Sequence, residues 1–472
     1  MLFNSFAFVF FVLVTFGVFY LPRLRPLQNY TLIVASLIFY AYGQPALVFL
    51  LLLSILINAT SSYFVLNTLA PFAKRAWAIS GVSLNLAVLF FFKYGPLAAA
   101  TFGLDTRDPN SIGHFLVTLP LPIGISFFTF QGISLVVDVY RQKENYPHRI
   151  LHRSVWRHFV DTALFKALFP QLVAGPIVKA HDFYPQIKPK YLRDIPWDRV
   201  FRALTTGYFL KMVVADNLKD FTFWIAYPYF FSISTVTLLT MLFGYSMQIF
   251  ADFAGYSLIA IGTARLFGYE LMENFNFPYI SQSLSEFWRR WHISLSTWLR
   301  EYLYIPLGGN RKSNAHTYLN LMIVMALGGL WHGAAWSYAI WGIFHGCGLA
   351  VERFFQKARV RGQRERFSVV RMLLVFGFVT FAWLLFKLPN FTHVISFIKA
   401  CFTNFDREDD ARTIAFILFY SAPVVAYHLL HLRKQYSGVA ISPSWQSLGY
   451  GTCLFALLVN SGSPGTFIYF QF

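Results

Sequence analysis

Long apolar stretches recur from one end of this chain to the other, and they restrict its possible folds more than any other feature. They cover residues 3–21, 46–66, 229–251, 367–388 and 411–430. Each approaches the roughly 20 residues that an α-helix needs to cross the hydrocarbon core of a bilayer. Only 13% of the 472 residues are charged, well below the roughly 25% typical of soluble domains. The sequence therefore predicts an all-α, polytopic integral membrane protein.

The net charge of +18 is distributed unevenly among the loops. Loops at 42–45, 95–114 and 403–410 are poor in basic residues, and the last is acidic overall. The basic residues gather in the intervening loops: Arg23, Arg25, Lys74, Arg75, Arg141, Lys143, Arg149, Arg153, Arg157, Lys or Arg at 353, 357, 359, 361, 364 and 366, Arg433 and Lys434. Cytoplasmic loops of membrane proteins carry the excess of Lys and Arg. We therefore expect about eleven spans, cytoplasmic basic loops and both termini outside. No basic patch is interleaved with aromatic residues, so nucleic-acid binding is not predicted.

Two segments do not read as simple spans. Residues 169–187 contain three prolines and a glycine, which exclude one continuous helix. Irregular backbone at membrane depth must be buried in protein or line a wet cavity, so a re-entrant or interfacial segment is expected there. Residues 285–310 place Trp and Leu near helical spacing, with charges between them. This pattern predicts an amphipathic helix at the cytoplasmic interface, anchored by its tryptophans.

His332 occupies an unusual position, in the stretch LGGLWHGAAW (327–336). The flanking apolar segments, 316–330 and 335–352, predict a hairpin that turns or weakens near its glycines at 328, 329 and 333. Arg311 and Lys312 are expected on the cytoplasmic side. About 18 residues at 1.5 Å each then place His332 up to ~27 Å from Lys312, deep in the bilayer or towards its outer side. Ionisable residues at that depth are usually functional, and histidine exchanges a proton near neutral pH. A simple hydrogen bond to a neighbouring helix is the alternative.

LGGLWHGAAW, together with EFWRRWHISLSTWLREYLYIPLGGNRK (286–312), resembles the membrane-bound O-acyltransferase (MBOAT) family. The resemblance is to the alginate O-acetylation branch and, more distantly, to the branch that transfers D-alanine to lipoteichoic acid. LPIGISFFTFQGISLVVDVYR (121–141), FADFAGYSLIAIG (250–262), ENFNFPYISQSLSEFW (273–288) and the C-terminal FIYFQF fit the same pattern, so the resemblance covers nearly the whole chain.

The resemblance implies a ring of membrane helices around a central tunnel, with a cytoplasmic thioester donor and an acceptor hydroxyl outside. The donor would be acetyl-CoA or an acyl carrier protein thioester, used as a substrate without a tightly bound cofactor. The family's invariant histidine matches His332, and its second histidine matches His292. Acyl transfer needs a base for the attacking hydroxyl, and His332 is the candidate. Direct transfer and an acyl-histidine relay both remain open.

Further candidates for lining the donor site or tunnel are weaker, and each has a structural alternative. Asp252 and Tyr256 are polar positions in an apolar run, and Asp252 could instead pair with a buried base. Arg289 and Arg290 could attract an anionic donor or simply anchor the cytoplasmic side. The remaining candidates are Trp331, Asn274, Gln282 and Ser285. His345 is expected to make a structural hydrogen bond. No His, Cys or carboxylate cluster has zinc-site spacing, so no metal is predicted.

The predicted function is acetyl transfer across a bacterial inner membrane for O-acetylation of an exported or cell-wall polysaccharide, with a periplasmic or extracellular acetyltransferase partner. The alternatives are D-alanyl transfer to teichoic acid, a transporter, and a non-catalytic scaffold for polysaccharide export. The transporter would usually show internal repeats, and none is evident. The whole chain is expected to form one membrane domain, with N-terminal helices at 1–140, a catalytic core at 141–352 and C-terminal helices at 353–472.

Overall fold

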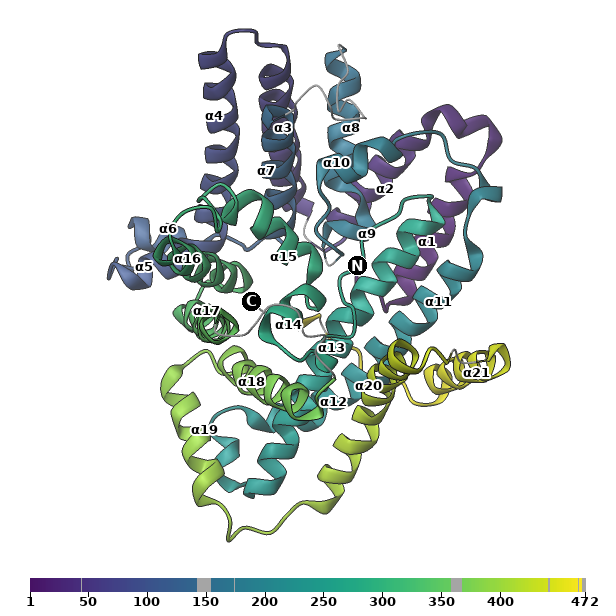
Figure 1. Cartoon of the computed structure of the whole chain (residues 1–472). Coiled ribbons are helices and arrows are strands. Elements are labelled where there is room, and N and C mark those ends of the chain that lie inside the picture. The colour runs from purple at the N-terminus through teal and green to yellow at the C-terminus, as the bar shows by residue number, and fades with distance from the viewer. Residues whose placement is uncertain are drawn as a thin grey trace. The chain divides into compact units, whose positions relative to one another are not determined.

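The computed structural model describes residues 1–43, 45–141, 154–173, 175–357, 367–439, 442–465 and 467–468. These residues form helices and connecting turns, with no strand among them (Figure 1), which confirms the all-α prediction. They group into two compact units. Unit 1 contains residues 1–201 and 260–272, and unit 2 contains 202–259 and 273–472. The predicted boundaries at 140 and 352 stay a prediction.

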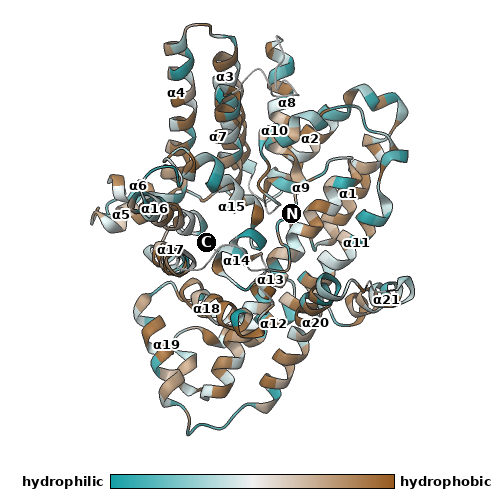
Figure 2. Cartoon of the chain, in the orientation of Figure 1, coloured by the Kyte–Doolittle hydropathy of each residue, from teal (hydrophilic) through white to brown (hydrophobic). Residues whose placement is uncertain are grey.

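Five described helices are long and apolar enough to cross a membrane, and a bent N-terminal pair would make a sixth. They cover Pro45–Asn67, Pro71–Thr101, Thr235–Leu266, Val369–Lys387 and Ala411–Ser437. Figure 2 shows apolar residues along much of these helices. Many of their large apolar side chains are exposed, as lipid contact requires: Leu374 is 69% exposed and Phe419 is 64% exposed. The multi-pass prediction is confirmed, whereas the count of eleven stays a prediction.

Unit 1 contains the N-terminal helices and most of the Pro-rich middle of the chain. Its elements are α1 (Phe6–Phe19), η1 (Pro22–Leu27), α2 (Gln28–Ala41), η2 (Pro45–Leu47), α3 (Val48–Asn67), α4 (Pro71–Leu89), the π-helical turn η3 (Phe90–Tyr94), α5 (Gly95–Thr101), α6 (Ile112–Thr118), α7 (Ile125–Arg141), α8 (Val155–Ala167), α9 (Phe169–Leu172), α10 (Ala180–Phe183), η4 (Tyr184–Gln186), η5 (Leu192–Asp194) and the first turn of α11 (Trp197–Tyr208).

Polar side chains link the long helices of unit 1, where α3, α4 and α7 lie side by side (Figure 1). Asn58 and Asn85 exchange amide hydrogen bonds of 3.1 and 2.9 Å between α3 and α4. Lys166 of α8 donates to Ser54 of α3 at 2.6 Å. Such bonds hold membrane helices together because lipid offers polar groups no other partner. Residues 169–187 are broken into short pieces and mostly buried, as the prolines predict.

Unit 2 carries the remainder of α11 and the C-terminal half of the chain. Its elements are the π-helical turn η6 (Phe209–Ala215), α12 (Asp216–Thr222), η7 (Phe223–Ile225), η8 (Tyr229–Ser232), most of α13 (Thr235–Leu266), η9 (Pro278–Ile280), α14 (Leu284–Arg290), α15 (Ile293–Leu299), the π-helical turn η10 (Arg300–Tyr304), α16 (Asn314–His332), α17 (Trp336–Lys357), α18 (Val369–Lys387), α19 (Phe391–Thr403), α20 (Ala411–Ser437) and α21 (Pro443–Val459).

The predicted amphipathic helix over 285–310 is wrong in two respects. The segment divides into α14, α15 and η10, with a break at His292. Trp291 is fully buried and Trp298 is 6% exposed, so these rings belong to the core and are not interface anchors. The break turns the chain, and the apolar positions of both short helices can then face inward.

Several sequence-based predictions fall outside the described residues. They are the basic positions 143, 149, 153, 359, 361, 364 and 366, and residues 469–472 of the C-terminal motif.

Candidate active site

His292 adopts a backbone conformation that few side chains tolerate. Its φ and ψ are 43° and 55°, in the left-handed region, between α14 and α15. A non-glycine residue persists there only when its surroundings impose the conformation, and such residues cluster at functional sites. Two backbone hydrogen bonds fix the chain on either side of His292. The Asn276 amide donates to the Arg290 carbonyl, and the Ile293 amide donates to the Asn274 carbonyl, each at 2.9 Å.

The side chain of Asn274 also determines which nitrogen of His292 carries the proton. The Ser294 backbone N–H, which can only donate, bonds the Asn274 Oδ1 at 3.3 Å, and this identifies that atom as an acceptor. His292 Nδ1 lies 3.1 Å from the same oxygen, so Nδ1 is the donor and bears the hydrogen. In the neutral ring Nε2 then carries the lone pair. The Asn274 Nδ2 donates to Ser257 Oγ at 3.1 Å, which ties the amide to α13.

His332 is the last residue of α16 and lies close to His292. The centroids of the two imidazole rings are 6.2 Å apart, and Trp331 lies 5.7 Å from the His292 ring. Trp341 and Phe386 contact the His332 ring edge to face, at 5.1 and 5.5 Å. His292 is fully buried and His332 is 3% exposed. The structure therefore brings the two histidines predicted as catalytic into one buried aromatic cluster.

The glycines around His332 serve helix packing more than helix breaking. The predicted turn is confirmed at Gly333, where α16 ends, but α16 continues unbroken through Gly328 and Gly329 to His332. A Cβ on Gly329 would lie 2.0 Å from the Tyr338 carbonyl oxygen of α17. A Cβ on Gly333, where the helix does end, would lie 2.2 Å from the Tyr338 ring. The backbones of α16 and α17 therefore approach each other closely beside His332. The two helices lie next to each other in Figure 1.

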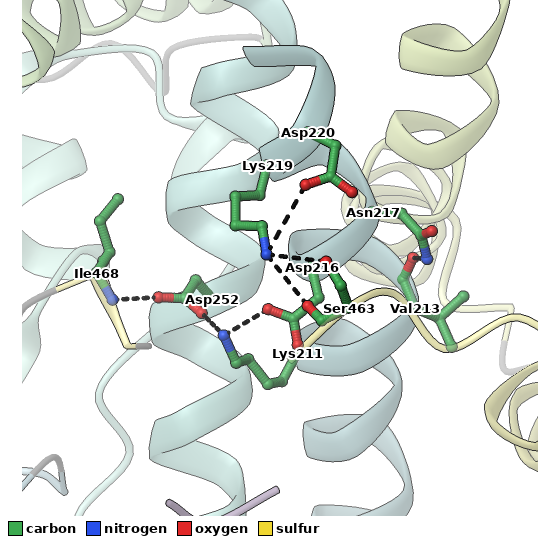
Figure 3. Close-up of polar contacts among 9 residues, drawn as sticks. All are labelled: Lys211, Val213, Asp216, Asn217, Lys219, Asp220, Asp252, Ser463 and Ile468. Carbon is green, nitrogen blue, oxygen red and sulfur yellow. Dashed lines mark hydrogen bonds and ion pairs between the residues drawn. The ribbon is translucent and has the colours of Figure 1, made fainter. Parts of the chain in front are cut away.

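Asp252 belongs to a buried charge cluster (Figure 3). Lys211 Nζ lies 2.7 Å from one oxygen of Asp252 and 2.7 Å from one oxygen of Asp216. The other Asp252 oxygen accepts the Ile468 backbone N–H at 2.8 Å, which fixes the C-terminal tail. The sequence-based alternative that Asp252 pairs with a buried base is confirmed. Tyr256 packs over Lys211, with 5.3 Å from Nζ to the ring centroid.

Aromatic contacts connect this cluster to the histidine site. Phe467 of the tail lies 4.4 Å from the Tyr256 ring and 5.6 Å from the Phe253 ring. Phe253 in turn meets the His292 ring at 4.7 Å, edge to face. The C-terminal tail is therefore packed against a ring that itself contacts His292.

The remaining candidates make structural contacts on and around α14. Arg290 pairs with Glu286 at 2.9 Å and donates to the Asn276 carbonyl at 3.0 Å, whereas Arg289 is exposed. Gln282 accepts from the Ser368 amide at 2.7 Å. The Ser285 amide donates to Glu352 at 3.2 Å, a carboxylate that caps the start of α14. None of these contacts reaches either histidine.

His345 departs from its predicted hydrogen bond. Within the described residues, neither ring nitrogen has a hydrogen-bond partner. The ring is instead fully buried among aromatic side chains, with Trp341 at 4.8 Å and Trp288 at 5.1 Å. The described part of the chain contains no group of three or more His, Cys, Asp or Glu side chains that could hold a metal ion.

Sequence reasoning missed Lys211, Asp216, Ser257 and Ser294. The first two had a usable signal, because FLKMVVADNL (209–218) places a cation and a carboxylate in an apolar run. The two serines carry no such signal, since their role depends on Asn274 lying between them.

Residues 112–394 match the model of the MBOAT, membrane-bound O-acyltransferase family. This chain therefore belongs to that family of membrane acyltransferases. The probable alginate O-acetylase AlgI of Pseudomonas putida is 38% identical over 403 residues, covering 83% of this chain and 78% of the relative. The peptidoglycan O-acetyltransferase of Helicobacter pylori is 35% identical, covering 78% and 72%. The teichoic acid D-alanyltransferase of Bacillus subtilis is 26% identical, covering 66% and 77%.

Proposed function

We propose that this enzyme moves an acetyl group from a cytoplasmic thioester to the outer side of the membrane, for O-acetylation of an exported or cell-wall polysaccharide. Alginate, cellulose and peptidoglycan are the candidate polymers. Acetyl-CoA is the proposed donor, with an acyl carrier protein thioester as the alternative. The relatives whose names specify O-acetylation, at 35–38% identity, support acetyl as the acyl group.

The buried His292–His332 pair is the observation that carries the chemistry. His332 removes the proton of the attacking hydroxyl while that oxygen attacks the acyl carbonyl. The carbon–sulfur bond of the thioester then breaks, and the thiolate leaves as the free thiol with the proton that His332 returns. His292, held by Asn274 with its lone pair on Nε2, accepts a hydrogen bond from a reacting group or orients it beside His332. The surrounding tryptophans exclude water, which would otherwise hydrolyse the thioester.

The proposed setting is a bacterial inner membrane, with both termini outside. A separate periplasmic or extracellular acetyltransferase receives the acetyl group and completes the modification of the polymer. D-alanyl transfer to teichoic acid is the second candidate, supported by the 26% identical relative from Bacillus subtilis.

The test is acyl transfer by the full chain in lipid nanodiscs, with radiolabelled acetyl-CoA and the loss of thioester as the readout. We expect turnover in the wild type and a loss of at least about 100-fold in His332→Ala. His316→Ala is the matched control, because His316 lies exposed at the other end of the same helix. Equal turnover in wild type and His332→Ala would overturn the role of His332.

The choice of donor is tested in the same nanodiscs. Turnover with a D-alanyl carrier-protein thioester, but not with acetyl-CoA, would favour the second candidate. Turnover with an acetylated carrier protein alone would keep the acetyl group and change the carrier.

A further inference from the structure

Unit 1 contains a polar cavity of about 670 Å³ that the acyl-transfer site does not use. It forms where η1, the first turn of α2, α8 and the 184–189 segment meet. Its lining residues are Arg25, Pro26, Gln28, Asn29, Tyr30, Trp156, Arg157, Val160, Asp161, Tyr184, Pro185, Ile187, Lys188 and Pro189.

A buried glutamine fixes two walls of this cavity. Gln28, 5% exposed, donates to the carbonyls of Phe19 at 3.3 Å and Lys190 at 3.0 Å. Its own Oε1 accepts from the Lys190 amide at 3.0 Å. These hydrogen bonds hold the 187–190 segment against the start of α2. The walls of the cavity are therefore fixed by the fold.

The cavity carries a net positive charge. Arg25, Arg157 and Lys188 line it, and Asp161 is the one carboxylate among the lining residues. In the described part of the chain, no ion pair neutralises any of these three cations. Guanidinium groups match phosphate oxygens in charge and in planar geometry. The cavity therefore has the chemistry of a phosphate site.

An apolar groove of about 680 Å³ adjoins the cavity, and Tyr30 lines both. The groove runs between α1 and α2, and its lining includes Phe10, Val34 and Ile38. These side chains are 71%, 56% and 54% exposed. At the shared wall, the Trp156 Nε1 donates to the Tyr30 hydroxyl at 3.1 Å. A cationic cavity and an apolar groove that share a wall match a molecule with an anionic head and a hydrocarbon tail.

We propose that unit 1 carries a binding site for an anionic phospholipid, with its headgroup phosphate in the basic cavity and one acyl chain in the α1–α2 groove. The positive-inside rule assigns loops rich in Lys and Arg to the cytoplasmic side. Because the cavity is lined by such residues, we assign the lipid to the cytoplasmic leaflet. Lys and Arg near that surface attract anionic lipids, and burial of the chain adds an apolar contribution. A free nucleotide or phosphate would leave the groove unused.

The experiment is native mass spectrometry of the full chain in detergent with equimolar phosphatidylglycerol and phosphatidylcholine. We expect the wild type to retain phosphatidylglycerol preferentially. Arg25→Gln with Arg157→Gln should lower that preference at least about tenfold. The matched control is Arg193→Gln, since Arg193 is 83% exposed and does not line the cavity.

A second variant tests the groove without changing charge. Val34→Trp fills it and should lower phosphatidylglycerol retention, whereas Phe49→Trp, a change at a 76% exposed position outside it, should not. An excess of glycerol 3-phosphate should fail to displace the lipid. Displacement by glycerol 3-phosphate, equal retention of both lipids by the wild type, or wild-type preference in the double variant would overturn the proposal. Because the readout is bound lipid, these outcomes are independent of acyl transfer.

Discussion

At the scale of single residues, the site depends on Asn274 as much as on the two histidines. Its Oδ1 accepts from His292 Nδ1 and from both donors of Ser294, at 3.1, 3.3 and 2.9 Å. It therefore acts through His292, setting its tautomer and its left-handed backbone. This is the role that a carboxylate or amide plays behind a catalytic histidine in many hydrolytic sites.

Substitutions of Asn274 should show whether it positions the His292 ring or only packs in the core. Asn274→Leu removes the acceptor and should lower kcat at least about 100-fold at saturating acetyl-CoA, with a smaller effect on KM. Asn274→Asp keeps an acceptor for His292 Nδ1 and should retain more activity than Asn274→Leu. Acyl-transfer kinetics in nanodiscs give both constants. Equal loss in both variants, or none in either, contradicts the positioning role.

His181 of α10, which does not belong to a candidate membrane span, offers a pH test in unit 1. A hydrogen bond from His181 to Asp138, at 2.9 Å, raises the pKa of His181 above its ordinary value. A raised folded-state pKa stabilises the fold below the ordinary pKa, and the gain is lost as pH rises through the folded pKa. The wild type should therefore exceed His181→Gln in Tm at about pH 5.5 by more than at about pH 8.5. A Tm difference independent of pH would contradict the pair, and His316→Gln serves as the exposed control.

At the scale of elements, the C-terminal tail is held by the charge cluster of Figure 3. The cluster sets one lysine against two carboxylates, and their side chains are 2%, 3% and 5% exposed for Lys211, Asp216 and Asp252. Gly255 makes this possible, because a Cβ there would lie 2.8 Å from the Gly207 carbonyl oxygen and 2.9 Å from the Lys211 amide. Two helices that cross at glycines bring their backbones, and hence these charges, close together.

Lys211→Met should destabilise the protein by about 3–5 kcal/mol, because it leaves two buried carboxylates without their cation. Lys219→Met is the control, because Lys219 lies on α12 and contacts the same tail. Lys219 Nζ donates to the Ser463 carbonyl and hydroxyl at 3.1 Å, but its side chain is 36% exposed, so its loss should cost less than about 1 kcal/mol. Unfolding in detergent measures both. Similar costs would show that the cluster is not what holds the tail.

The α16–α17 hairpin gives the second prediction at this scale. Gly329→Ala places a methyl group 2.0 Å from the Tyr338 carbonyl oxygen and should lower both Tm and acyl transfer, by pushing α17 away beside His332. Gly377→Ala on α18 meets no atom within 4 Å, and the usual preference for alanine in a helix should leave it neutral or slightly stabilising. If the two variants unfold at the same temperature, the hairpin does not need this close approach.

The length of the apolar stretches predicts the long helices α3, α13, α18 and α20, because each helix coincides largely with one continuous stretch of the sequence. The site is predictable only in part. The position of His332 follows from its own segment, but the break at His292 depends on Asn274, 18 residues earlier, and on Ser257 beyond it. The partner of Asp252 is likewise 41 residues away. Hydrogen bonds of that reach leave no periodic signal in a single sequence.

At the scale of the whole molecule, the charge of the loops predicts the side of the membrane on which each terminus lies, and this constrains the number of spans. Both termini lie outside only if the chain crosses the membrane an even number of times. Eleven spans, an odd number, would put the two termini on opposite sides. The predicted count of about eleven therefore agrees with the predicted side of the C-terminus only if one span fewer or one more is correct. A re-entrant segment would enter the membrane without crossing it, and the sequence predicts one at 169–187, so this prediction would account for the difference.

Cysteine labelling in whole cells decides the orientation. In a chain whose Cys347, Cys401 and Cys453 are replaced by serine, a single cysteine at Asp406 or Ser461 should react with a membrane-impermeant maleimide. A cysteine at Asn310 or Ser437, beside the basic pairs 311–312 and 433–434, should react only after the membrane is opened. All of these introduced positions are exposed. The reverse pattern would place the basic loops outside, and the acceptor side proposed for His332 would be reversed with them. Labelling at 406 but not at 461 would instead place residue 461 on the cytoplasmic side, and the number of spans would then be odd if the N-terminus is outside.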